Sequence, residues 1–364
     1  MTNGLDDVVA AETRLSDVDG IGGRLIIRGV SLDALAGRTS FETVASMLLD
    51  GMFAQRGCPE GPDMVKALAA ARLRVFAHVA EPDDRLIALP AVDAMRALLA
   101  RLPDGDDLDT ALMLLAAPAV FLPAVLRGQK GLKPLAPSAD LSQSADILSM
   151  LTGRQPTPEQ TAALDAYLVT ISDHGLNAST FASRVIASTR AGLTSSALAA
   201  LGALKGPLHG GAPGPVLDML DAVATPDRAA AWIENALAHG ERLMGFGHRI
   251  YRVRDPRTDA LKKVLAPLAA SGQVKAERIV LAEAIEAAAL KILREKKPDR
   301  PLDVNVEFYT ALLLEALGFP RDAFTGVFAI GRMAGWIAHA REQALEGRLI
   351  RPRSVYVGPM PQAA

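Results

Sequence analysis

The sequence predicts a mainly α-helical protein, with its β-structure confined to a small hairpin near the N-terminus. Apolar residues recur at helical spacing along most of the chain. Aromatic residues make up only 4% of it, so Ala, Leu, Val, Ile and Met must build the core, which suits closely packed helices. At about 150 residues per domain, the 364 residues are enough for two or three domains.

The elements follow in order along the chain. The glycine cluster GIGG separates two short apolar runs within residues 9–30, which predicts the hairpin. Residues 41–50 place their apolar side chains on one helical face, and Ser40 is positioned to cap that helix. Further helices are predicted over 64–80, 84–102, 107–126, 158–172, 178–203, 215–224, 226–239, 258–270, 276–294, 305–317, 320–328 and 329–345. Glycine, proline or charged residues predict loops over 128–142, 206–215, 240–257 and 295–304, and a short extended segment is predicted over 348–358.

The most apolar stretch, residues 111–125, is shorter than the about 20 residues that a membrane-spanning helix needs. Because Pro118 and Pro123 interrupt it, a buried pair of helices with a proline break is predicted. The N-terminus is acidic and has no cationic segment, so no signal peptide is predicted. The chain is expected to be cytoplasmic and to have no membrane partner.

Composition and motifs argue against several kinds of partner. The net charge of −2 argues against nucleic acid as the main partner. Cys58 is the single cysteine, which excludes an internal disulfide and a multi-cysteine zinc site. No HExxH motif and no paired His or Cys at ligand spacing occurs, so no metal site is predicted. Gly245 and Gly247 do not complete a dinucleotide-binding GxGxxG.

The six histidines fall into two groups. A lone histidine in a helical chain is usually structural or on the surface, and His78, His239 and His339 fit that interpretation. His209 and His248 differ because they lie in the glycine-rich turns GPLHGG and GFGHR. Glycine lets the backbone approach a ligand closely, and loops on a rigid scaffold often carry function. For these two histidines, a structural and a catalytic role are both open.

Two more polar residues lie between predicted helices, in the sequence SDHGLNAS. His174 either ends the preceding helix or contributes to a site. Ser179 either caps the following helix or orients an imidazole by hydrogen bonding.

Arginines form a second candidate site. The guanidinium group binds carboxylates and phosphates through two parallel hydrogen bonds, so a cluster beside a loop histidine indicates an anionic small-molecule substrate. A solvated basic surface is the alternative. The residues concerned are Arg249, Arg252, Arg254 and Arg257 beside His248, with Arg332, Arg351 and Arg353 later in the chain.

Several motifs together resemble citrate synthases. They are GPLHGGA (206–212), GFGHRIYRVRDPR (245–257), SDHGLNASTFASRVIAST (172–189), NVEFYTALLLEALGFP (305–320), FTGVFAIGRMAGWIAHAREQ (324–343) and RPRS (351–354). The N-terminal segment VAAETRLSDVDGIGGRLIIRGVSLDALA is similar to the short bacterial form of the family, which includes 2-methylcitrate synthases. The resemblance runs in order and nearly from end to end.

The resemblance implies a two-domain, citrate-synthase-like helical homodimer. Residues 1–209 and 313–364 would form the large domain with the dimer interface, and residues 210–312 the small mobile domain. The cleft between the domains would hold the active site, completed by the partner chain. The implied reaction condenses acetyl-CoA with oxaloacetate to citrate and CoA, through an enolate and a citryl-CoA intermediate. No metal or redox cofactor is implied, because the CoA thioester is a substrate.

The resemblance also implies roles for individual residues. His209 matches the histidine that polarises the thioester carbonyl, and His248 the one that binds and protonates the oxaloacetate carbonyl. Glu307 stands at the position of the catalytic base. The remaining matches are substrate-binding and supporting positions: His174, Arg257 and Arg332 for oxaloacetate, Arg351 from the other subunit, Arg252 near the CoA phosphates, Phe328 beside the acetyl group, and Ser179 orienting the first histidine.

The sequence departs from the family pattern at three places. Glu307 stands where the family has aspartate, and the extra methylene moves the carboxylate by roughly an ångström, a shift that can cost about 10²-fold in rate. Gly175 replaces a glutamate, and Pro213-Gly214-Pro215 replaces an Asn-Glu-Ala-like stretch. Two alternatives to a citrate synthase are therefore open: a 2-methylcitrate synthase that uses propionyl-CoA, and a repurposed paralogue that binds CoA or carboxylates with low activity.

Overall fold

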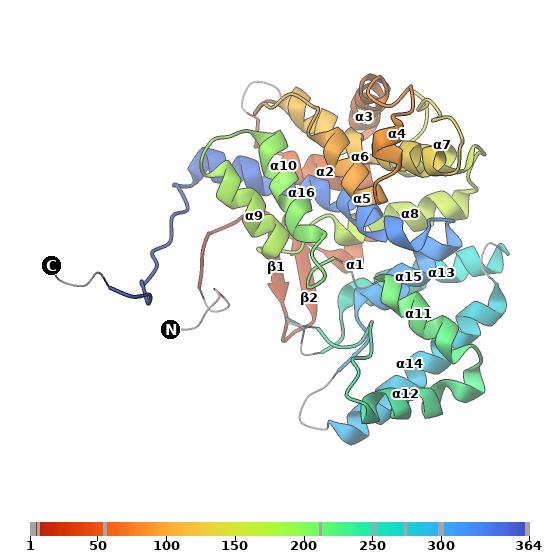
Figure 1. Cartoon of the computed structure of the whole chain (residues 1–364). Helices are drawn as coiled ribbons and strands as arrows, with labels where there is room; N and C mark the ends of the chain where they lie inside the picture. The colour runs from red at the N-terminus through yellow and green to blue at the C-terminus, as the bar shows by residue number, and fades with distance from the viewer. Residues whose placement is uncertain are drawn as a thin grey trace.

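The computed structural model describes residues 5, 8–53, 57–210, 213–248, 250–251, 253–272, 275–297 and 302–360. Within them the chain forms sixteen α-helices and three short strands, so the mainly α fold class is confirmed. The helices pack around α16 (Phe324–Glu346), which is buried along most of its length (Figure 1).

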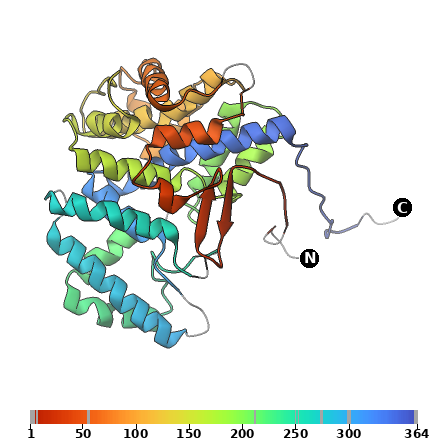
Figure 2. The same cartoon turned by 180° about the vertical axis from the view of Figure 1, so that it is seen from behind.

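The strands form a small antiparallel sheet near the N-terminus. β1 (Ser16–Asp19) pairs with β2 (Arg24–Ile27), and the Asp19 carboxylate closes the turn by accepting the Gly22 N–H at 2.7 Å. This confirms the hairpin. β3 (Val30–Ser31), which was not predicted, adds a third strand beside β2. Figure 2 shows the sheet at the side of the helical body from which the N-terminal segment leaves.

The first ten helices come before α16 in the chain, and several of them pack against it in the core. They are α1 (Leu32–Leu35), α2 (Phe41–Leu49), α3 (Gly61–Phe76), α4 (Asp84–Ile87), α5 (Ala91–Leu99), α6 (Leu108–Gln129), α7 (Gln143–Thr152), α8 (Pro158–Ile171), α9 (Ala178–Ala187) and α10 (Leu193–Leu204). The Ser40 side chain accepts the Thr43 N–H, so the predicted cap of α2 is confirmed. Helix α7 was not predicted, because its short apolar stretch follows directly on a proline-rich loop.

The apolar stretch 111–125 forms part of one continuous helix, α6, and the predicted proline break is wrong. Pro118 and Pro123 each remove one backbone donor, and apolar packing along the buried middle of the helix compensates for that loss. By length and hydropathy, α6 is also the one helix of the described residues that could cross a membrane. Of its most apolar 18-residue stretch, 72% is buried in the fold.

Two predicted helices are divided in the structure. The 84–102 prediction becomes α4 and α5, since Pro90 disfavours helical backbone at the residue before it. The 178–203 prediction becomes α9 and α10, since Arg190 and Gly192 adopt left-handed backbone with φ of 63° and 105°.

The predicted helices 320–328 and 329–345 are instead the single helix α16, preceded by a short 3₁₀ turn. Glycines inside α16 bring its axis close to its neighbours. A Cβ on Gly331 would lie 2.7 Å from Ile171 Cγ1, and one on Gly335 would lie 2.5 Å from the Ser172 carbonyl oxygen. The segment between α8 and α9 therefore lies directly on α16.

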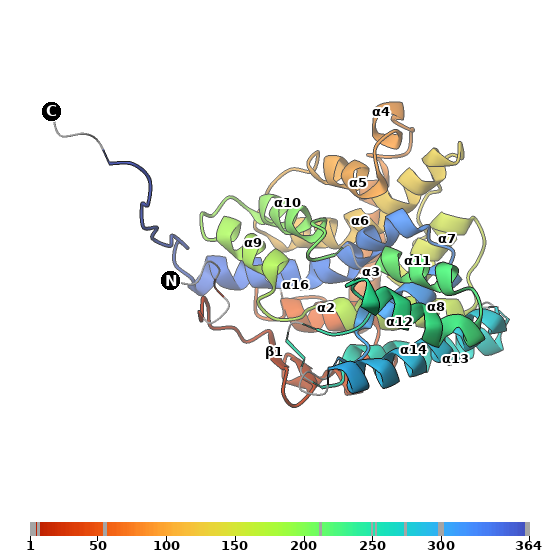
Figure 3. The same ribbon diagram turned by 60° about the horizontal axis from the view of Figure 1, so that its bottom comes forward.

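The remaining helices lie at the other end of the molecule, around α12 and α14 (Figure 1, Figure 3). They are α11 (Pro213–Val223), α12 (Ala229–Ala238), α13 (Pro256–Ala270), α14 (Ala276–Lys296) and α15 (Val306–Ala316). The division into residues 1–209 with 313–364 and 210–312 stays a prediction. Pro213 and Pro215 fall in the first turn of α11, where a proline loses no helical hydrogen bond.

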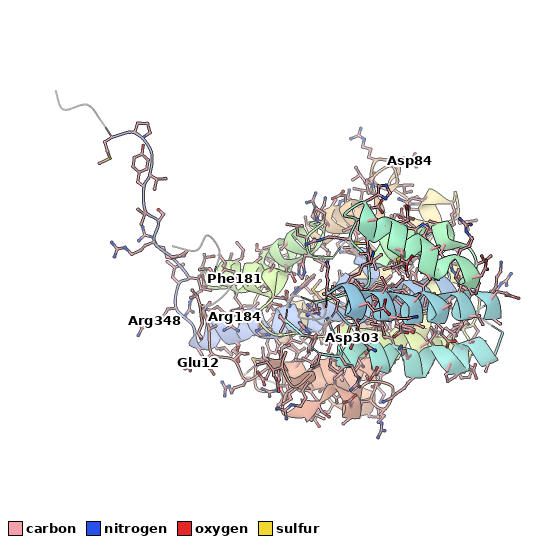
Figure 4. The ribbon with its side chains drawn as sticks, turned by 90° about the horizontal axis from the view of Figure 1, so that it is seen from below. Glu12, Asp84, Phe181, Arg184, Asp303 and Arg348 are labelled. Carbon is pink, nitrogen blue, oxygen red and sulfur yellow. The ribbon has the colours of Figure 1, made fainter. Side chains whose placement is uncertain are left out.

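The C-terminal segment leaves the body after α16 and projects away from it in every view (Figure 1, Figure 4). In Figure 4 it departs beside the labelled Arg348. Residues 351–357 are all exposed and have no regular secondary structure.

Candidate active site

Eight of the ten predicted site residues lie in loops, in the first turns of helices or on α16, and these segments meet between α8, α13, α15 and α16. His174 lies between α8 and α9, His209 after α10, and His248 before α13. The others are Arg257 in the first turn of α13, Glu307 in the first turn of α15, Phe328 and Arg332 on α16, and Ser179 on α9.

His248 and Arg257 are in direct contact. Arg257 Nη2 lies 3.0 Å from His248 Nε2, while His248 Nδ1 accepts the backbone N–H groups of Ile250 and Tyr251 at 3.0 and 3.1 Å. Burial and then the Arg257 charge lower the pKa of His248 to about 4, so its imidazole is neutral at pH 7. Because His248 Nδ1 accepts two backbone N–H groups, the single N–H of the neutral imidazole lies on Nε2, beside Arg257. An anionic ligand bound to Arg257 would therefore also accept a hydrogen bond from His248.

Asp255 holds Arg257 in place. Its carboxylate accepts Arg257 Nε at 2.9 Å and Nη2 at 2.8 Å, and both side chains are at least 95% buried. It also accepts the Val306 N–H at 3.2 Å, at the start of α15. One carboxylate therefore connects the arginine to the helix that carries Glu307.

The turn before His248 is joined to the segment before Glu307. The Gly247 N–H donates to the Asp303 carbonyl at 2.7 Å, and the Asn305 amide donates to the Gly247 carbonyl at 2.8 Å. Gly245 and Gly247 adopt left-handed backbone, and a Cβ on Gly245 would lie 2.9 Å from Phe308 Cδ2. The glycines of GFGH thus permit the contact that sets His248 beside α15.

Glu307 presents a carboxyl group in a largely desolvated place. Its Oε2 atom is fully buried and has no hydrogen-bond partner, although the residue as a whole stays partly accessible. Burial raises the pKa of Glu307 to about 7, helped by Asp255 and opposed by Arg257 and Arg332. A carboxylate of that pKa suits general base catalysis near neutral pH.

His174 lies against His248 and Tyr251. Its Nε2 is 3.2 Å from the Tyr251 hydroxyl, and its ring centroid is 5.7 Å from that of His248. Burial and the nearby arginines lower the pKa of His174 well below its usual value, so it is neutral as well. Gly175 adopts φ of +60° while its N–H donates to Ser16 at 3.0 Å, so left-handed backbone is a physical reason for glycine at this departure from the family pattern.

His209 is oriented by the first turn of α9. Its Nε2 lies 2.8 Å from Ser179 Oγ and 3.3 Å from the Ser179 backbone N. The Ser179 hydroxyl donates its proton to Asn177 Oδ1 at 2.7 Å, and the two contacts of His209 Nε2 hold the imidazole against the start of α9. Burial and then the Arg332 charge lower the pKa of His209 to about 4. The Trp336 indole N–H donates to Ser179 Oγ at 3.1 Å and so fixes that hydroxyl.

Arg332 is a buried cation on the central helix. Its Nε donates to the Ile171 carbonyl at 2.6 Å, and its guanidinium carbon lies 4.8 Å from the centre of the Phe328 ring. Burial lowers the pKa of Arg332 to about 10, so it stays charged at neutral pH. With Arg257 it gives the site two buried positive charges, the arrangement a dicarboxylate requires.

Two predicted site residues are not brought to this place. Arg351 lies on the exposed segment that projects from the body, away from this chain's own site. Arg252, predicted near the CoA phosphates, lies outside the described residues. The predicted role of Arg351 at a partner's site stays a prediction.

Sequence reasoning missed Asp255, Tyr251 and Trp336. Asp255 precedes a proline at the start of a predicted helix, which is a capping signature, but its reach to α15 is visible only in the fold. Trp336 follows Arg332 by one helical turn on the same face of α16.

His339 lies in a separate buried network. Its Nε2 contacts Asp173 at 3.1 Å and its Nδ1 contacts Arg184 at 2.9 Å, and Arg184 also pairs with Glu342 at 2.6 Å. Figure 4 shows Arg184 on the side from which the C-terminal segment leaves. These contacts agree with the structural role predicted for His339. Among the described residues, no group of three or more His, Cys, Asp or Glu could hold a metal ion.

Ser179→Ala is expected to reduce turnover up to about tenfold, since the lost hydrogen bond is worth about 0.5–1.5 kcal/mol and about 1.4 kcal/mol corresponds to a factor of ten. The matched control is Ser183→Ala, on the same helix, whose hydroxyl contacts the Trp336 carbonyl at 3.3 Å and not His209. Steady-state kinetics of both variants check this, and equal rates for the two would contradict the orienting role.

The sequence is similar to known proteins along nearly its whole length. Residues 4–353 match the family described as "Citrate synthase, C-terminal domain". A citrate synthase of Acidithiobacillus ferridurans is 34% identical, covering 98% of this chain and 95% of the relative. A citrate synthase of Deinococcus radiodurans is 33% identical, covering 98% and 96%.

Solved structures of citrate synthases have a fold similar to that of this chain. The citrate synthase of Thermotoga maritima superposes with a TM-score of 0.84 at 32% identity, covering 100% of this chain and 98% of the other. The citrate synthase of Thermoplasma acidophilum, in a ternary complex with carboxymethyl coenzyme A and oxaloacetate, gives a TM-score of 0.83 at 29% identity, covering 99% and 97%.

Proposed function

The chain belongs to the citrate synthase family, and from this premise we propose that it condenses acetyl-CoA with oxaloacetate to give citrate and CoA. The observation that supports the proposal most is the meeting of one carboxylate of pKa about 7, neutral imidazoles and two buried guanidinium groups in one place.

The reaction begins at the thioester methyl group. The Glu307 carboxylate takes a proton from the α-carbon while the imidazole N–H of His209 donates to the carbonyl oxygen, so the negative charge of the enolate forms against a fixed donor. A neutral donor suits this step, because it stabilises the oxygen without transferring its proton too early.

Carbon–carbon bond formation follows. The enolate carbon attacks the ketone carbon of oxaloacetate, and the ketone oxygen takes a proton from His248. Arg257, Arg332 and His174 would hold the carboxylates and carbonyl of oxaloacetate. Water then hydrolyses the citryl thioester, which releases citrate and the CoA thiol.

The assembly and the surroundings belong to the same proposal. The chain works as a homodimer in the cytoplasm, with Arg351 completing the partner's site and Arg252 near the CoA phosphates. It needs no metal or redox cofactor, since acid–base chemistry and a thioester account for every bond made. The C-terminal segment is exposed and projects from the body of the chain, which supports a role for Arg351 at the partner's site.

Thiol release on mixing acyl-CoA with oxaloacetate tests the proposal. Purified, folded protein is expected to release thiol with acetyl-CoA and, more slowly, with propionyl-CoA, because one methylene is worth only about 1–3 kcal/mol in an apolar pocket. A higher kcat/KM for propionyl-CoA would identify a 2-methylcitrate synthase. No release with acetyl-, propionyl- or butyryl-CoA, together with calorimetric binding of CoA or a dicarboxylate, would identify a binding paralogue and overturn the proposal.

A further inference from the structure

The N-terminal hairpin contacts both segments that carry the histidines proposed to bind oxaloacetate. The start of β1 lies at the segment that carries His174, between α8 and α9. The turn between β1 and β2 lies at the segment that follows His248, before α13 (Figure 2). One small element therefore connects two parts of the site that are far apart in the sequence.

Ser16 on β1 contacts both chain neighbours of His174. Its Oγ atom accepts the Gly175 N–H at 3.0 Å. Burial raises the pKa of Asp173, but interactions with His339 and a hydrogen bond from Ser16 lower it overall. A single hydroxyl group of the hairpin thus fixes the backbone on either side of the imidazole.

The glycine at position 175 permits this contact. Its φ of +60° is in the left-handed region, and a Cβ there would lie 3.2 Å from Val18 Cγ2 on β1. Helix α16 holds the other end of the segment, because the Gly335 N–H donates to the Ser172 carbonyl at 3.1 Å. His174 accordingly lies between an anchor on α16 and an anchor on β1.

The turn of the hairpin packs directly on the backbone that follows His248. A Cβ on Gly20 would lie 2.4 Å from the Ile250 carbonyl oxygen, and one on Gly23 would lie 2.9 Å from the Arg254 carbonyl oxygen. The glycines therefore let the two backbones meet with no side chain between them. The Ile250 N–H is also one of the two donors to His248 Nδ1, so the turn packs on a residue that orients the imidazole.

We propose that the hairpin positions both histidines for one ligand: Ser16 sets the backbone of His174, and the turn at Gly20 sets the segment that orients His248. The two imidazole rings lie 5.7 Å apart, measured between their centroids. A displacement of one ring relative to the other would weaken a ligand that contacts both. Ser16 and Gly20 act through the histidines and are positioning residues. The inference rests on the proposed function for the identity of the ligand, oxaloacetate.

The first experiment compares Ser16→Thr with Ser16→Val. Both replacements are β-branched and suit a strand, so the pair differs in the hydroxyl group. Ser16→Val is expected to weaken oxaloacetate binding in calorimetry by up to about tenfold, and to raise its KM equally, because the Gly175 N–H loses its acceptor. The KM for acetyl-CoA should stay within twofold. Ser16→Thr should keep the values of the unmutated protein, as should the control Ser31→Ala, at an exposed position of β3.

The second experiment compares Gly20→Ala with Ile21→Ala, using NMR of protein labelled with ¹⁵N-histidine. Gly20 does not adopt left-handed backbone, so alanine acts there through the collision with Ile250. The imidazole signals of His248, assigned by their loss in His248→Gln, are expected to shift in Gly20→Ala. They should stay unchanged in Ile21→Ala, because the Ile21 side chain is 82% exposed in the same turn.

The same spectra report on His174 in the ligand-free protein. Its signals, assigned by their loss in His174→Gln, should shift in Ser16→Val and not in Ser16→Thr. Equal His174 signals in these two variants, or unchanged His248 signals in Gly20→Ala, would overturn the positioning role even in an active enzyme. Shifted signals in a protein that neither binds oxaloacetate nor releases thiol would support the positioning role and overturn the proposed function.

Discussion

Glu307→Gln is expected to lower the rate of thiol release by about 10³-fold, because an amide of the same shape cannot take the α-proton and a general base contributes about 10²–10⁴-fold. In the unmutated protein the pKa of Glu307 is about 7, so kcat/KM is expected to rise with pH up to about 7 and to level off above it. The Glu307→Gln variant should show neither this rate nor this rise of kcat/KM with pH.

The same substitution is expected to stabilise the protein at pH 8. An unfolded glutamate titrates near its ordinary value of 4.5, whereas the folded group titrates at about 7. The folded state therefore binds the proton more tightly, and the free energy of unfolding falls as pH rises between those two values. At about 1.36 kcal/mol per pKa unit, the amide should recover up to about 3 kcal/mol at pH 8 and almost nothing at pH 4.

Thermal unfolding at the two pH values measures this, with Glu315→Gln as the control. Glu315 lies on the same helix but is partly exposed and paired with Arg278. An activity close to that of the unmutated protein in Glu307→Gln, or a melting temperature that does not rise at pH 8, would refute the assignment of Glu307 as a buried base.

Asp255→Asn is expected to lower the free energy of unfolding by about 3–5 kcal/mol, because it leaves the buried Arg257 charge without its partner. Asparagine still caps the first turn of α13, so the loss of charge is isolated from the loss of a cap. Activity should fall at least about 10²-fold, since the connection between Arg257 and the start of α15 is weakened as well.

The control for this variant is Asp259→Asn, one turn further along α13. Asp259 pairs with Arg254 near the surface, where an ion pair is worth about 0–1 kcal/mol. Urea unfolding of both variants gives the comparison. Equal destabilisation by the two would show that the Asp255–Arg257 pair is not the buried structural link described above.

Local signals in the sequence predicted the hairpin and most helices, because helical spacing and capping act over a few residues. The predictions were wrong where contacts between residues far apart in the sequence determine whether a helix continues. Pro118 and Pro123 were expected to break a helix that core packing keeps continuous. Helices 178–203 were expected to be one, although Arg190 and Gly192 turn the chain there.

For the site, residue type and resemblance predicted which side chains meet, and the structure brings eight of them together. Their electrostatic state could not be read from the sequence. The pKa values of Glu307, His209 and His248 depend on burial and on charges from other segments of the chain. Asp255 gains its importance only from the helix that the fold places beside it.

The glycines of α16 also limit how this enzyme can be engineered. Gly331 and Gly335 lie inside a helix, where alanine ordinarily stabilises by about 1 kcal/mol, so a propensity-based redesign would replace them first. Here a single methyl group would collide with Ile171 or with the Ser172 carbonyl. The collision would push away the segment beside Arg332 and Trp336. Directed evolution for heat resistance should therefore find its gains on the exposed helix surfaces, and mutational scanning should show this face of α16 as intolerant as the catalytic residues themselves.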